Sequence, residues 1–162
     1  METITAQEIL TEKSNDYRAI LFGGLLAGVL DLTAAFITNG LRGGSPVTVM
    51  QSISSGLLGK ESFTGGAATA TLGVFLHFTI AFIWTIIFYL ASRKIKFLTA
   101  QPIVSGVLYG IAVYIFMYFL IVPLSAAPFK MPITFQTIVT NVLIHIFCVG
   151  LPIALTVRRF SK

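Results

Sequence analysis

Three ionisable side chains, Asp31, His77 and His145, stand inside otherwise apolar stretches of the chain. Ionisable groups are costly to place in hydrocarbon, so those that occur there usually face other protein groups and mark a functional site. Histidine titrates near neutral pH, and a neighbouring carboxylate can move that titration. A carboxylate and two imidazoles at one depth would therefore be able to pass protons, or to hold a cation or a small polar ligand.

The composition is typical of an integral membrane protein. Of the 162 residues, 56% are hydrophobic and only 10% are charged, against about 25% in an average soluble domain. The net charge of +5 does not indicate a nucleic-acid partner, because the basic residues flank the apolar stretches and form no patch. The single cysteine, Cys148, excludes an intramolecular disulfide and a CxxC redox motif.

Four stretches are long enough to cross a bilayer as helices, since about 20 residues at ~1.5 Å each span a core of ~30 Å. They predict an all-α integral membrane protein, a four-transmembrane-helix bundle over residues 19–157 with an amino-terminal segment (1–18) and a short basic tail (158–162). The expected spans are Ala19–Thr38, Ala67–Ala91, Ile103–Val122 and Ile133–Val157. Pro152 is expected to kink the fourth span, because proline removes a helical hydrogen bond.

The distribution of Lys and Arg predicts the orientation. Eight lie in the amino-terminal segment, the loop between spans two and three and the tail, whereas three, Arg42, Lys60 and Lys130, lie in the other two loops. Positive charge favours the cytoplasmic side. We therefore expect both termini in the cytoplasm, in a multi-pass membrane protein.

The two outer loops carry local signals of their own. Ser45 is a good N-cap and Pro46 suits a first helical position, so Pro46–Leu58 is expected to be a short amphipathic helix that ends near Gly59. Its apolar positions include Val49, Met50, Ile53 and Leu57. The second outer loop, Val122–Pro132, holds three prolines and is expected to be extended and stiff.

Each ionisable residue shares a helix face with small residues, because residues three or four apart lie on one face. Small residues mark the surfaces where membrane helices pack closely. This spacing predicts helix packing at five glycines, Gly24, Gly28, Gly73, Gly106 and Gly110, and it adds Tyr114 and Asn141 to the inward faces of spans three and four.

The depths of these polar residues also agree. Counted from the cytoplasmic ends at ~1.5 Å per residue, Asp31, Tyr114 and His145 lie ~16–18 Å deep and His77 ~22 Å deep. We therefore expect one polar layer of Asp31, His77, His145, Asn141 and Tyr114 near the middle of the membrane, which binds or relays protons, an ion or a small ligand.

Two other interpretations of the layer stay open. It could serve only helix packing in an accessory or structural subunit of a membrane complex, since interhelical polar contacts are common in membrane proteins. It could also hold a single b-type haem, with His77 and His145 as axial metal ligands and with Gly73 making room for the ring. Zinc bound by Asp31 and both histidines is a weaker variant. HExxH, GxSxG and P-loop motifs do not occur in the sequence, so catalysis is not favoured.

Two segments resemble a known family. The stretch LHFTIAF in the second span and the aromatic-rich third span are similar to the YagU family of small bacterial inner-membrane proteins. The resemblance covers about a third of the chain and leaves out LRGGSPVTVMQSISSGLLGKESFTGG. It implies a bacterial cytoplasmic membrane and no defined reaction. The partners expected are the lipid bilayer, other membrane proteins or further copies of the chain.

Overall fold

The computed structural model describes residues 6–129 and 133–160, with side chains described from residue 15 onward. Within these ranges the chain is helical and contains no strand. The α-helices are α1 (Ala6–Gly40), α2 (Pro46–Leu58), α3 (Gly66–Lys94), α4 (Phe97–Ala100), α5 (Pro102–Phe116), α6 (Val122–Leu124), α7 (Phe135–Ile144) and α8 (Leu151–Phe160). A 3-10 turn, η1 (Gly59–Phe63), follows α2, and two π-helical segments, η2 (Met117–Ile121) and η3 (His145–Gly150), interrupt the later helices.

Four helical stretches are long and apolar enough to span a membrane, as the sequence predicts. Two of them are continuous across several elements: α5, η2 and α6 form one, and α7, η3 and α8 form the other. Their bounds are Asn15–Gly40, Gly66–Lys94, Pro102–Leu124 and Phe135–Phe160. These bounds differ from the predicted ones by one to four residues, because helices extend beyond their most apolar part.

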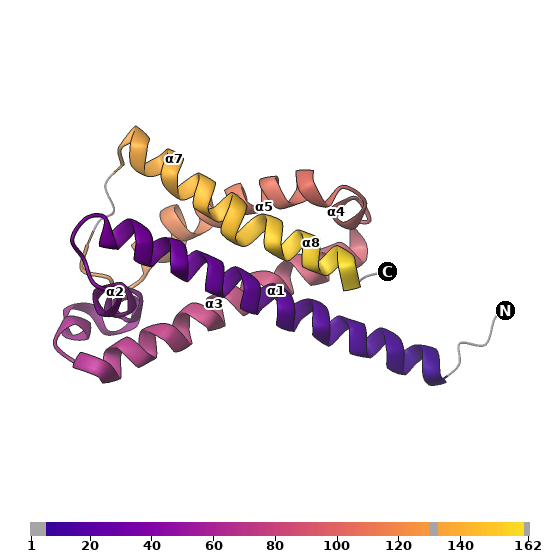
Figure 1. Ribbon diagram of the computed structural model, residues 1–162, viewed down its shortest axis with the longest axis horizontal. Helices are drawn as coiled ribbons and strands as arrows, with labels where there is room; N and C mark the ends of the chain where they lie inside the picture. The colour runs from indigo at the N-terminus through magenta and orange to yellow at the C-terminus, as the bar shows by residue number, and fades with distance from the viewer. Residues whose placement is uncertain (1–5, 130–132, 161–162) are drawn as a thin grey trace.

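The amino-terminal segment is not a separate structural unit where the structure describes it. The α1 helix runs without a break from Ala6 to Gly40, so residues 6–18 continue the first span. At ~1.5 Å per residue this helix is ~52 Å long, and its amino-terminal part projects beyond the other helices (Figure 1). Arg93 of α3 lies 3.7 Å from the carboxylate of Asp16 on this projecting part.

The four long helices converge at one end and separate at the other. Figure 1 shows them close together near α4 and the end of α8, and apart toward α2 and the start of α7. Helix α1 packs against α3 and α8, while α5 packs against η3 and α8. Side chains rather than close backbones join α3 to α5: Tyr109 Oη donates to the carbonyl of Trp84 at 2.5 Å, and the Tyr109 ring meets Phe88.

The best-packed core lies at the converging end. Ile153, Ala154 and Val157 of α8 are fully buried, against Ala19 of α1 and Phe88 of α3. Small side chains on α1 and α8 let these two helices approach closely, which is the usual packing mode of membrane helices. This end of the molecule is therefore sealed by apolar contacts.

Glycines set the close contacts between helices. A Cβ atom at Gly110 would lie 2.6 Å from the carbonyl oxygen of His145, and one at Gly106 would lie 3.0 Å from Leu151 Cα. Gly150, which the sequence interpretation does not single out, faces both of these glycines. On the other side of the molecule, the rings of Phe82 and Phe78 cover Gly24 and Gly28 respectively.

Helix α2 has the predicted bounds, but its buried face matches the predicted apolar positions only in part, with Val49 buried. Thr48 N donates to Ser45 Oγ at 3.2 Å, and Gly59 ends the helix with φ 63°. The buried side chains are mainly small and polar, whereas Leu57 of the predicted apolar face is 63% exposed. The difference arises because α2 presses against α3, where the carbonyl of Met50 occupies the place of a side chain at Gly73, and such close contact needs small residues.

A polar network fastens α2 to the start of α3. Ser62 Oγ donates to the carbonyl of Gln51 at 2.6 Å and lies 2.5 Å from Ser54 Oγ. Thr69 Oγ1 donates to the carbonyl of Ser62 at 2.7 Å, and Gln51 Nε2 donates to the carbonyl of Gly66 at 3.2 Å. Because these groups are buried and bonded, α2 is held as part of the fold.

The second outer loop is only partly extended. Residues Val122–Leu124 are helical and continue the third span, and the extended part begins at Ser125. Pro132 of the predicted stiff loop lies outside the described residues. Ala126 N donates to the carbonyl of Gly56 at 2.9 Å, so this loop is tied to α2.

Candidate ligand-binding site

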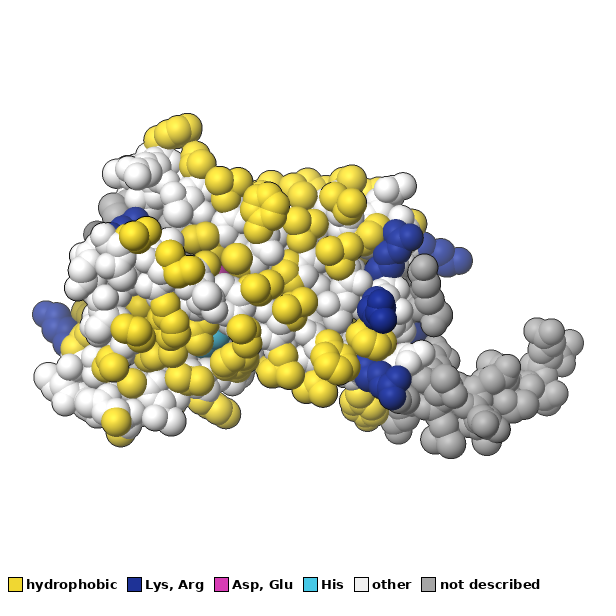
Figure 2. Space-filling model, viewed as in Figure 1, with side chains coloured by type: hydrophobic (Ala, Val, Ile, Leu, Met, Phe, Trp, Pro, Cys, Tyr) yellow, Lys and Arg dark blue, Asp and Glu magenta, His cyan; other side chains and the backbone are white. Residues whose placement is uncertain are grey.

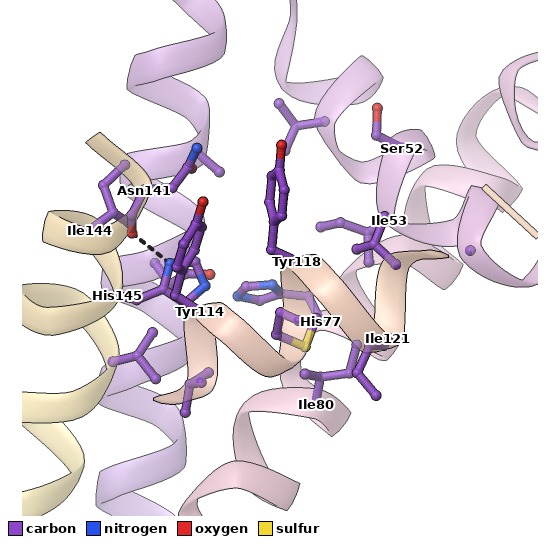
Figure 3. A pocket seen from close by; sticks show the side chains of 18 of the residues that line it. Ser52, Ile53, His77, Ile80, Tyr114, Tyr118, Ile121, Asn141, Ile144 and His145 are labelled. Atoms are coloured by element: carbon purple, nitrogen blue, oxygen red, sulfur yellow. Dashed lines mark hydrogen bonds between the residues drawn. The ribbon is translucent and has the colours of Figure 1, made fainter. Parts of the chain in front are cut away.

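A cavity of about 620 Å³ lies where the helices separate. Its wall includes all five residues that the sequence places in one polar layer, namely Asp31, His77, Tyr114, Asn141 and His145. Figure 3 labels the last four of them. Residues of α1, α2, α3, α5, η2, α7 and η3 contribute to it. Most of the remaining wall is apolar, which is the usual composition of a small-molecule site.

Four of the five polar residues lie at one depth, and Asn141 lies one turn nearer the start of α7. Asp31 is nine residues before the end of α1, Tyr114 is ten before the end of α6, His145 is ten after the start of α7, and His77 is eleven after the start of α3. At ~1.5 Å per residue these positions are ~14–17 Å from the outer ends of their helices. In a hydrocarbon core of ~30 Å this is about the middle.

Two π-helical segments shape the wall. Each ends two residues before a proline: η2 (Met117–Ile121) before Pro123, and η3 (His145–Gly150) before Pro152. Proline donates no backbone hydrogen bond, which loosens the preceding turn, and wide turns of this kind are frequent at functional sites. Met117, Tyr118 and His145 from these segments line the cavity. The predicted irregularity at Pro152 is thus a π-helical segment.

His77 links α3 to α1. Its Nε2 lies 2.9 Å from the carbonyl oxygen of Gly28. A carbonyl oxygen only accepts, so Nε2 carries the hydrogen and donates it. The contact is possible because Gly28 leaves space for α3, whose Phe78 ring covers that glycine. In Figure 3 the imidazole of His77 reaches toward Tyr114 and His145.

His145 is held within its own helix. Its Nδ1 lies 2.8 Å from the carbonyl oxygen of Asn141, one turn earlier, and donates to it. The ring also meets the ring of Tyr114 edge to face, with 5.6 Å between centroids. Figure 3 shows these three residues grouped at one side of the pocket.

Asp31 is not bonded to either histidine. Among the described side chains, no hydrogen-bond donor or cation pairs with its carboxylate, and each histidine donates to a backbone carbonyl instead. The two histidines therefore take part in the layer through backbone carbonyls and not through Asp31. Within residues 15–129 and 133–160, no three His, Cys, Asp or Glu side chains are placed to hold a metal ion, so the structure does not support the zinc arrangement.

Tyr114 contributes a buried hydroxyl group without a partner. Only 3% of the residue is exposed, and Tyr114 Oη is the one buried side-chain polar atom of the described residues that makes no hydrogen bond. The Tyr114 and Tyr118 rings are 5.4 Å apart, and their hydroxyl groups point the same way (Figure 3). An unbonded buried hydroxyl costs ~1–3 kcal/mol, and a ligand in the cavity would remove that cost.

The geometry does not fit a haem between the two histidines. His77 Nε2, the atom expected to face the iron, is engaged by Gly28. The space beside Gly73, which the haem interpretation needs for the ring, is filled by the Met50 backbone. Gly73 thus serves the packing of α2 on α3.

The cavity extends from mid-depth to the outer loops. Its rim includes Asn39 and Arg42 at the end of α1, Ser52 on α2, and Ser125 in the second outer loop. At the inner end, Trp84 closes it, supported by edge-to-face contacts with Tyr109 and Phe116. Sequence spacing could have found Trp84, two turns after His77 on the same face. Asn39 continues the Asp31 face of α1 at helical spacing, whereas Ser52 and Ser125 have no such signal, because tertiary contacts bring α2 and the second outer loop to the cavity.

Comparison of the chain with protein-family models, with curated proteins and with solved structures finds no match. The resemblance to the YagU family therefore stays a prediction from the sequence. The fold defines a helical protein, and four of its helices are long and apolar enough to span a membrane.

Proposed function

We propose that the protein is an integral membrane protein that binds a small ligand between its four spans, from the side opposite its termini. The observation that carries this proposal is the cavity of about 620 Å³, within the ~300–1,000 Å³ usual for small-molecule sites. Asp31 and Tyr114 line it, and among the described residues the Asp31 carboxylate and the buried Tyr114 hydroxyl have no hydrogen-bond partner. A structural role alone supplies no reason to keep both groups unbonded.

Charge supports the orientation. Dark-blue basic side chains gather at the end where the helices converge, while a hydrophobic surface covers the middle (Figure 2). Arg93, Lys94, Lys96 and Arg159 are exposed near the ends of α3 and α8. By the positive-inside preference this end is cytoplasmic, so both termini lie in the cytoplasm and the cavity opens outward. In a bacterium the protein would lie in the inner membrane and face the periplasm.

Binding is favoured over a proton relay. A relay needs hydrogen-bonded groups across the whole membrane. Here the inner half is filled by apolar residues such as Ile153 and Phe88, and Asp31 bonds to neither histidine. The purely structural alternative, an accessory subunit, is supported by one interhelical bond of the layer, between His77 and Gly28.

Native mass spectrometry tests the proposal without a guess at the ligand. The full chain, purified in mild detergent from the membrane that produces it, is expected to retain a small molecule that collisional activation releases. Asp31→Asn should lower the retained fraction at least fivefold. Asp16→Asn is the matched control, because Asp16 is on the same helix and outside the cavity.

Wild-type protein without any retained molecule at several protein and detergent concentrations would contradict the proposal. Equal retention in Asp31→Asn and Asp16→Asn would also contradict it. A pH jump on proteoliposomes examines the relay: proton flux above empty liposomes that Asp31→Asn abolishes would favour the relay over binding.

A further inference from the structure

We propose that the ligand is a protonated amine, an organic cation that carries N–H donors on an apolar body. This inference rests on the proposed binding function and names its substrate class. It follows from an account of which hydrogen-bonding atoms around the cavity are still free.

Both histidines offer acceptors. His77 donates through Nε2 to Gly28, so the nitrogen that remains is Nδ1. His145 donates through Nδ1 to Asn141, so the nitrogen that remains is Nε2. In a neutral imidazole whose one nitrogen donates, the other nitrogen is an acceptor. The two rings that line the cavity thus each present a lone pair.

Asn141 and Asp31 add further hydrogen-bond acceptors to the cavity wall. Asn141 Nδ2 donates to the carbonyl of Thr137 at 2.8 Å, which leaves the amide oxygen of Asn141 as an acceptor. When it is ionised, the carboxylate of Asp31 accepts only, and it has no partner among the described residues. Four side chains of one layer can therefore present acceptors, and the layer has one carboxyl group and no Lys or Arg.

The hydroxyl of Tyr114 is the second, independent sign of a ligand. Tyr114 lines the cavity, and its hydroxyl is buried and lacks a hydrogen bond within the described residues. An ammonium group brings up to three donors and no acceptor, so it can supply the donors that the Tyr114 hydroxyl and the Asp31 carboxylate lack. An anion would instead face the Asp31 carboxylate and an excess of acceptors, which is unfavourable in a low-dielectric site.

The rest of the wall suits the apolar body of such a cation. Trp84, Tyr114 and Tyr118 offer aromatic rings, and a cation over an aromatic face is attracted by the ring quadrupole. Ile80 and Ile144 offer aliphatic contacts (Figure 3). The cationic side chain of the wall, Arg42, is exposed at the rim beyond the end of α1, where water and salt screen its charge.

Three probes of one size and different charge test the inference: 2-phenylethylammonium, 2-phenylethanol and phenylacetate, titrated into the full chain in lipid nanodiscs by calorimetry. The ammonium is expected to bind at least tenfold more tightly than the alcohol, with phenylacetate weakest. Its N-trimethyl derivative, which lacks N–H donors, should bind at least threefold more weakly than the primary amine. Asp31→Asn should reduce the tenfold preference to less than threefold, while Asp16→Asn, outside the cavity, keeps it.

Equal or tighter binding of the alcohol or of phenylacetate would overturn the amine assignment and leave the proposed binding function intact. Failure of all three probes to bind would overturn the assignment as well. The mass spectrum of the wild type distinguishes a failure of the amine assignment from a failure of the proposed binding function, since a retained molecule that is not an amine contradicts only the assignment. Tyr114→Phe guards against a folding defect of Asp31→Asn and is expected to weaken amine binding at least threefold.

Discussion

Two tyrosines on the same helix have hydroxyl groups in opposite situations. Tyr109 Oη donates to the carbonyl of Trp84 and does not line the cavity, whereas Tyr114 Oη is buried, unbonded and at the cavity wall. The first arrangement stabilises the fold directly. The second lowers stability until something in the cavity supplies a partner, which is the energetic pattern of a group kept for binding.

Removal of the Tyr109 hydroxyl and removal of the Tyr114 hydroxyl should therefore affect stability differently. Tyr109→Phe is expected to lower the free energy of unfolding of the empty protein by ~0.6–2 kcal/mol, the range for interhelical hydrogen bonds in membranes. Tyr114→Phe should leave it unchanged or raise it, yet lower ligand retention. Thermal unfolding in detergent and native mass spectrometry measure the two effects. A loss of stability in Tyr114→Phe equal to that in Tyr109→Phe would contradict the binding role.

The two histidines also differ in what they hold together. His77 bonds to Gly28 on another helix, while His145 bonds to Asn141 on its own helix. We expect His77→Ala to destabilise the protein by ~0.6–2 kcal/mol more than His145→Ala, because only the first removes a bond between helices. Thermal unfolding of the two variants in one detergent measures the difference. Equal melting temperatures would contradict this division of roles.

At the level of elements, the sequence predicts where a helix begins and ends better than it predicts which of its residues contact the rest of the protein. The bounds of α2 follow from Ser45, Pro46 and Gly59, because caps and positive-φ glycines act locally. Its buried face could not be predicted in this way: hydrophobic periodicity assumes that apolar means buried, and a helix beside a membrane can present apolar residues to lipid. The sequence places the polar residues of the layer on inward helix faces near one depth. It does not predict which residues form the cavity rim or whether Asp31 bonds to the histidines, because both depend on loops and side-chain contacts.

The serine network is expected to hold α2 on α3. Ser62 is fully buried and bonds to Gln51 and Ser54, so Ser62→Ala removes both bonds and leaves Ser54 without one of its partners. The expected loss of stability is ~1–3 kcal/mol, with faster hydrogen exchange of the amides of α2. Ser52→Ala is the control, because Ser52 bonds only within α2, to Thr48. Equal exchange rates in both variants would contradict the network's role.

The contact of α5 with η3 depends on a missing side chain. A Cβ at Gly110 would lie 2.6 Å from backbone atoms of His145 and Ile146, whereas nothing lies within 4 Å of one at Gly40. Gly110→Ala should therefore destabilise the protein by ~1–3 kcal/mol, the usual cost of overpacking, while Gly40→Ala changes stability little. Thermal unfolding compares the two. A tolerated Gly110→Ala would show that the helices are less closely packed than described.

The whole molecule is asymmetric along its length. Fully buried residues such as Ala154 and Val157 seal the end that carries most of the basic side chains, and the cavity occupies the other half. The sequence predicts the four spans and the basic end, because both depend on composition and count. It does not predict the cavity, since the π-helical segments and the packing of α2 against α3 and α1 are not evident from composition and count.

The account depends most on a water-accessible cavity that opens outward, and cysteine accessibility measures this directly. In a Cys148→Ala background, Ala35→Cys places a thiol on the cavity wall and Thr33→Cys places one on the exposed face of the same helix. A membrane-impermeant methanethiosulfonate is applied to intact cells and to inverted vesicles. We expect it to modify Ala35→Cys from outside only, and Thr33→Cys, which faces hydrocarbon, from neither side. Modification of Ala35→Cys from the cytoplasmic side alone, or from neither side, would contradict the account.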